Sequence, residues 1–295
     1  MTALADFLIA LALAPLLPGI INRVKAFFAG RQGQSPFQLY YDLLKLLRKG
    51  AVYSTCATYV FRLGPVIGLA AMLGALAVMP GGSGDALHNF DGGIIFFAYL
   101  LALARFAAIL AALDTGSSFE GMGASREALY SALAEPPLFV ALAMLVKTTG
   151  GLSFEAAFPD AALLGGTPRL LAAAALFLVF LAENCRIPTD DPNTHLELTM
   201  MHEVMVLDHS GPDFAFISYG AALKMWVLGA LTARFLLPFG PGFELRQEAL
   251  FLAAMFAIAL LTGVVESCMA RLRLNRVPAM LLAALALSFA AFVTA

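Results

Sequence analysis

Long apolar stretches recur along almost the whole chain and constrain its fold more than any other feature. A membrane-crossing helix needs about 20 mostly apolar residues. Eight stretches meet that requirement: 3–23, 60–80, 92–113, 130–149, 169–185, 215–237, 248–269 and 277–295. Only 13% of the residues are charged, against about 25% in ordinary soluble domains. We therefore predict an all-α integral membrane protein of about eight transmembrane helices.

The Lys and Arg residues are divided unevenly between the two sides that these spans define. Four of the 18, Lys147, Arg169, Arg234 and Arg246, fall on one side, and the rest lie in or near the loops of the other. Basic residues concentrate on the cytoplasmic side of membrane proteins. The bias predicts that both termini face away from the cytoplasm, which agrees with an even number of spans. Basic residues follow the first span rather than precede it, which argues against a cleaved signal peptide.

The first cytoplasmic loop contains the pattern of a shorter helix. Ser35 suits its N-cap, Pro36 its first position and Gly50 the position past its end. Asp42 and Lys45 share one face, and the other face is aliphatic and aromatic. About 12 residues cannot cross a bilayer. We predict an amphipathic helix that lies on the membrane surface or packs under a partner, and an ordinary solvated face is the alternative.

Acidic residues occur where they are costly. An Asp or Glu at membrane depth costs roughly 2.5–3.5 kcal/mol on insertion scales, so it normally faces a protein interior or a water path. Glu135 precedes two prolines that we expect to break or kink the start of the fourth span; Glu183 ends the fifth span, and Glu266 lies near the end of the seventh. The segment 183–213 has seven acidic residues and one Arg. A basic partner or a proton path would explain this excess, and a solvated acidic loop is the alternative.

The same segment has the signals of a helix. Asp191 suits an N-cap and Gly211 the position past the end. His195, His202 and His209 are spaced by seven, so they would share a stripe about 10 Å apart along a continuous helix. That separation is too large for one ion, and we predict no metal site. Proton exchange, partner contact or packing are the roles left open for these histidines.

Other functional classes have no support in the sequence. The three cysteines lack CxxC spacing, which argues against a disulfide framework or a cysteine cluster. Phosphate-loop, dinucleotide-binding and nucleophile motifs are missing, so we expect no cofactor in this chain. A basic patch outside the loop flanks is also missing, which argues against nucleic-acid binding. Without an internal repeat or a linker, residues 1–295 are expected to form a single transmembrane domain.

Several short motifs, taken in order, resemble the family of the complex I H-type subunit (NADH dehydrogenase subunit 1). They are Arg31-Gln32-Gly33, Tyr41–Leu46, Leu113–Ser117, Gly123–Glu127, Glu135-Pro136, Glu183-x-x-Arg186-x-Pro188-x-Asp190, Glu197-Leu198, Ser210-Gly211, Glu266 and Met269–Leu274. Each motif is weak alone, but their order and spacing cover nearly the whole chain. The similarity is greatest to the hydrogenase branch, which includes the membrane subunits of formate hydrogenlyase and hydrogenase-4.

The resemblance implies a non-catalytic coupling and anchoring subunit of a bacterial inner-membrane oxidoreductase. It implies partners that hold the NiFe centre and the Fe–S clusters, namely hydrogenase-like large and small subunits on the cytoplasmic side, and antiporter-like membrane subunits. With the acids noted above it gives candidate proton-path or coupling residues: Asp114, Glu127, Glu135, Glu183, Asp190, Glu197, Glu203 and Glu266. The candidate loop and partner contacts are Arg31, Asp42, Lys45, Arg126, Arg186, His195, His202, Arg271 and Arg273.

The chain also departs from the family pattern. Asn193 and His195 stand where the complex I loop is richer in Glu, and Arg186 is unusual among hydrogenlyase relatives. These departures weaken the case for quinone binding. Two alternative functions stay open at this point, a quinone-chamber subunit of an NADH:quinone oxidoreductase and a stand-alone ion transporter. A transporter would be expected to show inverted repeats, and none is evident in the sequence.

Overall fold

The computed structural model describes residues 2–82, 84–160, 166–190, 201–237 and 245–295, and within these ranges it is helical without strands. Its elements are α1 (Thr2–Leu13), α2 (Leu16–Phe28), α3 (Gln38–Leu47), α4 (Tyr59–Val78), α5 (Gly93–Asp114), α6 (Ser118–Thr149), α7 (Phe154–Asp160), α8 (Gly166–Glu183), the short 3-10 helix η2 (Glu203–Val206), α9 (Gly211–Leu236), α10 (Leu245–Cys268), the 3-10 helix η3 (Leu274–Arg276) and α11 (Val277–Thr294).

The predicted number of spans is confirmed. Among the described residues, seven helices are long and apolar enough to cross a membrane, and α1 and α2 make an eighth span if the pair counts as one. The pair is bent by 43°. Pro15 stands at the start of α2, and a proline inside a helix removes a backbone hydrogen bond and forces a kink. The first span is therefore two helices rather than one straight helix.

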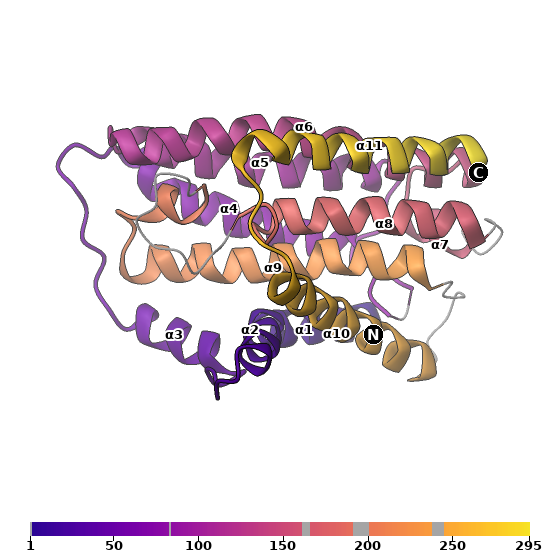
Figure 1. Ribbon diagram of the computed structural model, residues 1–295, viewed down its shortest axis with the longest axis horizontal. Coiled ribbons are helices and arrows are strands. Elements are labelled where there is room, and N and C mark those ends of the chain that lie inside the picture. The colour runs from indigo at the N-terminus through magenta and orange to yellow at the C-terminus, as the bar shows by residue number, and fades with distance from the viewer. Residues whose placement is uncertain (1, 83, 161–165, 191–200, 238–244) are drawn as a thin grey trace.

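Most of the long helices run side by side along the long axis of the molecule (Figure 1). The loops 29–58 and 201–210 lie toward one end, which we call the long-loop end, and the segment 184–190 after α8 lies on the same side but nearer the middle (Figure 1). The chain termini lie toward the opposite end, where the Thr2 hydroxyl hydrogen-bonds Asp85 and the Lys147 ammonium donates to the Phe292 carbonyl. Both termini are therefore on the same side of the bundle.

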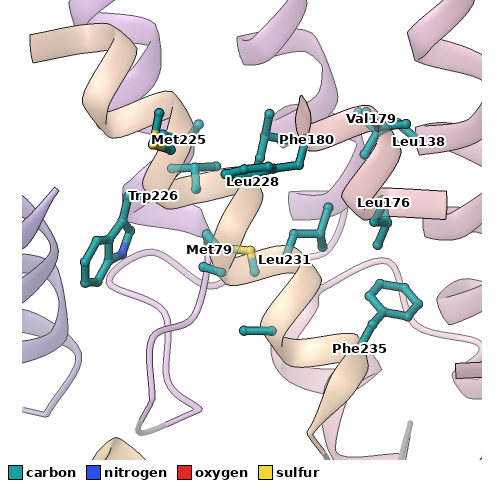
Figure 2. Close-up of a cluster of buried hydrophobic side chains, with 14 of the residues drawn as sticks. Met79, Leu138, Leu176, Val179, Phe180, Met225, Trp226, Leu228, Leu231 and Phe235 are labelled. Atoms are coloured by element: carbon teal, nitrogen blue, oxygen red, sulfur yellow. The ribbon is translucent and has the colours of Figure 1, made fainter. Parts of the chain in front are cut away.

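Helix α9 forms the centre of the bundle. Its residues from Leu223 to Phe235, except Lys224, are almost all buried, so it is apolar on all sides, as expected for a helix surrounded by others. Figure 2 shows Leu228 and Leu231 of α9 beside Phe180 and Leu176 of α8. Trp226 points to the other side, where its ring packs edge-on to Phe251 of α10 at 6.5 Å between centroids. The central helix thus positions its one lysine, Lys224, within a rigid frame.

Helix α6 differs from the prediction. The fourth span was expected to begin with a broken turn at Glu135, but α6 begins at Ser118 and continues through Pro136 and Pro137 to Thr149. Prolines are tolerated in membrane helices when neighbouring groups satisfy the freed backbone carbonyls. The consequence is functional, because the continuous helix places Glu127 and Glu135 on one rigid element.

The two predicted loop helices had different outcomes. The amphipathic helix of the first loop is present as α3, although it begins at Gln38 rather than Pro36. The expected helix between Asp191 and Gly211 is not continuous, because residues 201–210 contain only turns and the four-residue η2. His202 and His209 therefore do not share a helical stripe. His195 and Glu197 lie outside the described residues.

Candidate functional site: a buried charge network

Arg105 joins two of the predicted acidic residues. Arg105 Nη1 lies 2.5 Å from Glu135 Oε1 on α6. Arg105 Nη2 lies 2.9 Å from Glu183 Oε1 on α8. The Arg105 side chain is only 8% exposed. The planar fork of arginine can hold two carboxylates at once, which a lysine cannot do in the same way. Arg105 thus ties α5, α6 and α8 together inside the bundle.

The second Glu183 oxygen binds another buried cation. Lys224 Nζ of α9 lies 2.8 Å from Glu183 Oε2. Glu127 lies about two helical turns before Glu135 on α6. It is close enough to Lys224 and Arg105 to interact with both charges. The network therefore extends across α5, α6, α8 and α9.

His202 connects this network to the long-loop end. Its Nδ1 lies 3.6 Å from Glu127 Oε2. Cys185 and the Glu127 carboxylate raise the pKa of His202 well above its ordinary value, and they outweigh the opposing effect of burial. The loop that bears His202 approaches α6 closely at Gly123. This approach depends on the glycine, because a Cβ at this residue would lie 2.5 Å from Val204 Cγ1.

With His202 protonated, this network is electrically balanced. We name it the charge network: Arg105, Glu127, Glu135, Glu183, His202 and Lys224, which are three cations and three anions. Isolated charges at this depth would each cost several kcal/mol, and mutual pairing is what makes them tolerable. A change in one protonation state would leave an unpaired buried charge, so the members are expected to respond together.

A cavity opens onto the charge network. It has a volume of about 100 Å³ and apolar walls from α4, α5 and α9. Its polar lining includes Arg105, Glu127, His202, His209 and Lys224. A cavity of this size holds several water molecules. The cavity can therefore hold water or a small ligand beside the network.

Two further ion-pair groups fix the loops around the charge network. Arg271 Nη2 lies 2.6 Å from the buried carboxylate of Asp190. Glu266 of α10 is 2.9 Å from Lys25 Nζ of α2 and 3.6 Å from Arg186 Nη1. Asp190 also accepts a hydrogen bond from the Met201 backbone N–H at 3.1 Å. These contacts hold the segment after α8 against both the following loop and the last helices.

The remaining candidates lie apart from the charge network or at the surface. Arg31, Lys45 and Arg273 are exposed, and Asp42 accepts a hydrogen bond from Gln38 on α3. Arg126 is partly buried beside Glu127 on α6, and Glu203 begins η2. These residues are placed where they could contact partner proteins, and their role as partner contacts stays a prediction.

Asp114 has a local structural role. It accepts hydrogen bonds from the backbone N–H groups of Thr58 at 2.6 Å and Phe61 at 3.2 Å, which begin α4. Replacing Asp114 by Ala should therefore lower the free energy of unfolding by about 0.5–2 kcal/mol, the usual cost of losing a helix cap. Thermal melting in detergent measures this change. Asp114→Asn, which keeps an acceptor oxygen, serves as the control, and an unchanged melting temperature for the Ala variant would contradict the role.

His209 gives the long-loop end a predicted pH dependence. It is buried, its ring stacks on Phe61 at 3.9 Å, and burial lowers its pKa despite the nearby Asp213 and Asp208. The unfolded chain then binds the proton more tightly than the folded chain. The contribution of His209 to stability is present above its unfolded pKa of about 6.5 and is lost as the pH falls through the folded value.

The matched variant is His209→Phe, which keeps an aromatic ring against Phe61 but binds no proton. Wild-type melting temperature should fall more steeply than that of the variant between pH 7 and about pH 5. Parallel melting curves for the two proteins would show that His209 does not titrate in this range.

The sequence interpretation missed Arg105 and Lys224 as site residues. Both were counted with the loop charges, although each stands inside a predicted span, 92–113 and 215–237. A basic residue within an apolar span is itself a signal of a functional or paired group. The positions of Arg105 and Lys224 in the sequence were therefore sufficient to predict them as site residues.

A second cluster of buried charged residues lies at the opposite end of the bundle. Asp6 of α1, Glu248 of α10 and Arg234 of α9 are each more than nine-tenths buried there. The Arg234 guanidinium also donates a hydrogen bond to the Gly81 carbonyl. This group is distant in the fold from the long-loop end and fixes α1, α9 and α10 to the loop after α4.

The fold and the charge network together define a multi-pass helical membrane protein with buried ion pairs at its long-loop end. A family model described as NADH dehydrogenase matches residues 2–295. The chain belongs to this family, that of the complex I H-type subunit.

Individual relatives give a finer placement. The chain is 32% identical to formate hydrogenlyase subunit 4 of Escherichia coli K12 over 99% of its own length and 97% of that protein. It is 33% identical to hydrogenase-4 component C of the same organism over 91% of its length and 87% of that protein. A chain of the membrane-bound sulfane sulfur reductase, an archaeal respiratory membrane complex, has the same fold, with a TM-score of 0.82, 21% identity and 98% of each chain covered. The predicted family and its hydrogenase branch are thereby confirmed.

Proposed function

We propose that this chain is the membrane-arm coupling and anchoring subunit of a complex I-like, energy-converting oxidoreductase of the group 4 NiFe hydrogenase or formate hydrogenlyase type. The observation that carries the proposal is the charge network, which extends from the His202 loop to the four long helices α5, α6, α8 and α9. Full-length similarity to formate hydrogenlyase subunit 4 supports the choice of complex.

In this function the charge network passes a charge change from the loops into the membrane. Electron transfer in a docked soluble arm shifts the charge or position of the loop that bears His202. Glu127 then loses or gains a cationic neighbour, and the balance of Lys224, Glu183 and Arg105 changes with it. A proton or sodium ion taken up to restore neutrality links electron transfer to ion movement. Antiporter-like membrane subunits receive the change through the helices.

The orientation in the membrane is part of the proposal. The bias of Lys and Arg puts the long-loop end in the cytoplasm of a bacterial inner membrane, and the termini on the periplasmic side. Hydrogenase-like large and small subunits then dock on the long-loop end. Exposed basic residues there, including Arg31, Lys45 and Arg273, are suited to acidic partner surfaces.

The metal cofactors belong to the partner subunits in this proposal. A typical Fe–S cluster takes four cysteine thiolates, and this chain has three cysteines in all. Two of them, Cys56 and Cys268, are exposed, and Cys185 is buried. The residues present do not fit a cluster of that kind, so the NiFe centre and the Fe–S clusters are assigned to the docked arm.

One observation favours an alternative. The cavity beside the charge network has apolar walls and a polar end formed by Arg105, His202 and Lys224, which is the chemistry that a quinone head group and tail would need. The chain would then be the quinone-chamber subunit of an NADH:quinone oxidoreductase.

Purification in a mild detergent, followed by mass spectrometry of the associated proteins, tests the proposal. A NiFe large subunit with its metal-binding cysteines, an Fe–S small subunit and antiporter-like subunits are expected. NADH-binding subunits would support the alternative. A chain that purifies alone and transports ions after reconstitution would contradict both and would support a stand-alone transporter.

A further inference from the structure

Three potential metal ligands from three separate segments converge beside the cavity, and two of them, Glu127 and His202, line it. They are Glu127 of α6, Cys185 just after α8 and His202 just before η2. One ligand atom from each lies within 4.8 Å of the other two. Glu127 and Cys185 are 7% and 5% exposed. The histidine spacing in the sequence could not reveal this group, because only one of the histidines contributes.

We propose that Glu127, Cys185 and His202 form a binding site for a borderline-soft divalent metal ion, with Zn²⁺ as the preferred occupant. The donor set is one thiolate, one imidazole nitrogen and one carboxylate oxygen, which are the three ligand types that zinc uses in proteins. Mg²⁺ and Ca²⁺ prefer all-oxygen sites, so the sulfur selects against them.

The geometry is close to that of a zinc site. With metal–ligand distances of about 2.0 Å for nitrogen and oxygen and 2.3 Å for sulfur, tetrahedral ligands are about 3.3–3.6 Å apart. His202 Nδ1 and Glu127 Oε2 are already 3.6 Å apart. A contraction of at most about 1.5 Å brings the three ligand atoms around one ion. The ion then replaces the present contact between His202 and Glu127.

The chain directs the Cys185 sulfur to this place at a conformational cost. Arg186 N–H donates to the Leu181 carbonyl at 2.8 Å, and Cys185 N–H donates to the Ala182 carbonyl at 3.2 Å. This pair of bonds is a Schellman motif, and Cys185 occupies its left-handed position with φ = 50°. Glycine is usual there because a side chain strains the left-handed backbone conformation. A cysteine in this position brings the thiol between α6 and the His202 loop.

The cavity supplies an entry path and a fourth ligand position. Glu127 and His202 both line it, and it is large enough for water. Three protein ligands with one open position are typical of accessible zinc sites rather than closed structural ones. On binding, the ion replaces protons of Cys185 and His202, which leave to the solvent.

Occupation of this site would remove Glu127 and His202 from the charge network. Metal binding itself follows from the geometry and does not depend on the proposed function. Inhibition of ion movement by bound Zn²⁺ does rest on the proposed function. Binding and inhibition are therefore measured separately.

The binding test uses Co²⁺ as a spectroscopic substitute for Zn²⁺ on the full-length chain in its purified complex. Wild-type protein should bind one Co²⁺ at this site and show a thiolate-to-cobalt charge-transfer band that added Zn²⁺ abolishes. Cys185→Gly should lose the band, and glycine suits the backbone conformation at this position, so the variant is expected to fold. His202→Asn should weaken binding. Cys268→Ser and His88→Asn, at exposed residues outside the cavity, are matched controls that should keep the band.

A wild-type complex without the charge-transfer band, or a band that survives in the Cys185→Gly variant, would overturn the metal site. If the band is lost in Cys185→Gly and kept in the controls, the site is established. Zn²⁺ should then inhibit ion movement in the wild type and not in Cys185→Gly. Binding without inhibition would keep the metal site and would count against the role of Glu127 in coupling.

Discussion

Arg105→Met is expected to lower the free energy of unfolding by about 3–5 kcal/mol, the usual cost of removing one partner from a buried ion pair. The loss comes mainly from the buried pair with Glu183 at 2.9 Å, where both side chains are less than one-tenth exposed. The pair with Glu135, at 2.5 Å, contributes less because the Glu135 side chain is 36% exposed. Lys224 remains as a partner of Glu183, whereas Glu135 has no second ion pair among the described residues. Thermal and denaturant unfolding in detergent measure the effect.

Two further variants make the Arg105 prediction specific. Arg105→Lys keeps the charge but cannot hold both carboxylates through a fork, so it should be intermediate in stability. Arg273→Met removes an exposed arginine at the same end and should change stability little. A melting temperature for Arg105→Met equal to that of the wild type would show that the charge network does not stabilise the bundle.

Glu183→Gln is expected to abolish coupled ion movement while the complex still assembles. Glu183 is the only described carboxylate that contacts both Arg105 and Lys224, so its charge holds the centre of the network. Glutamine has nearly the same shape and can still accept hydrogen bonds, but it neither carries the charge nor takes up a proton. Ion uptake by inverted membrane vesicles, measured together with the rate of electron transfer, should show the loss.

Asp91→Asn provides the control for the ion-uptake measurement. Asp91 is exposed and lies before α5, at the end opposite to the long loops. Its replacement should leave ion uptake and assembly unchanged. Full ion uptake in Glu183→Gln, with the control behaving as expected, would contradict a coupling role for the charge network.

The sequence was sufficient for the membrane fold because the bilayer imposes a simple rule on each span. A run of about 20 apolar residues has few alternatives to a helix. The rule is weaker at the ends of helices. Pro136 and Pro137 indicated a broken or kinked first turn in the span 130–149, yet α6 begins at Ser118 and continues through both prolines. Neighbouring helices can satisfy the backbone where a soluble helix would end.

The candidate site was predicted in part. Glu135, Glu183, Glu127 and His202 were all proposed, and the structure brings them together around Arg105 and Lys224. The partners could not be assigned from periodicity, since they come from helices far apart in the chain. The position of Arg105 and Lys224 inside apolar spans was the sequence feature that could have identified both as paired or functional cations.

Cys185 shows a different limit of sequence reasoning. A lone cysteine after a helix has no paired spacing to mark it, and its left-handed conformation is visible only in the structure. The meeting of Cys185 with Glu127 and His202 depends on the packing of α6 against the loop 201–206, which Gly123 allows. Such a group is a property of the tertiary fold.

Carboxylates of the charge network should change protonation when electrons pass through the complex. Redox-triggered infrared difference spectroscopy of the purified complex measures this directly, because protonated and ionised carboxyl groups absorb at different frequencies. We expect a carboxyl difference signal that disappears in Glu183→Gln and persists in Asp91→Asn. Identical difference spectra for the wild type, Glu183→Gln and Glu135→Gln would contradict it.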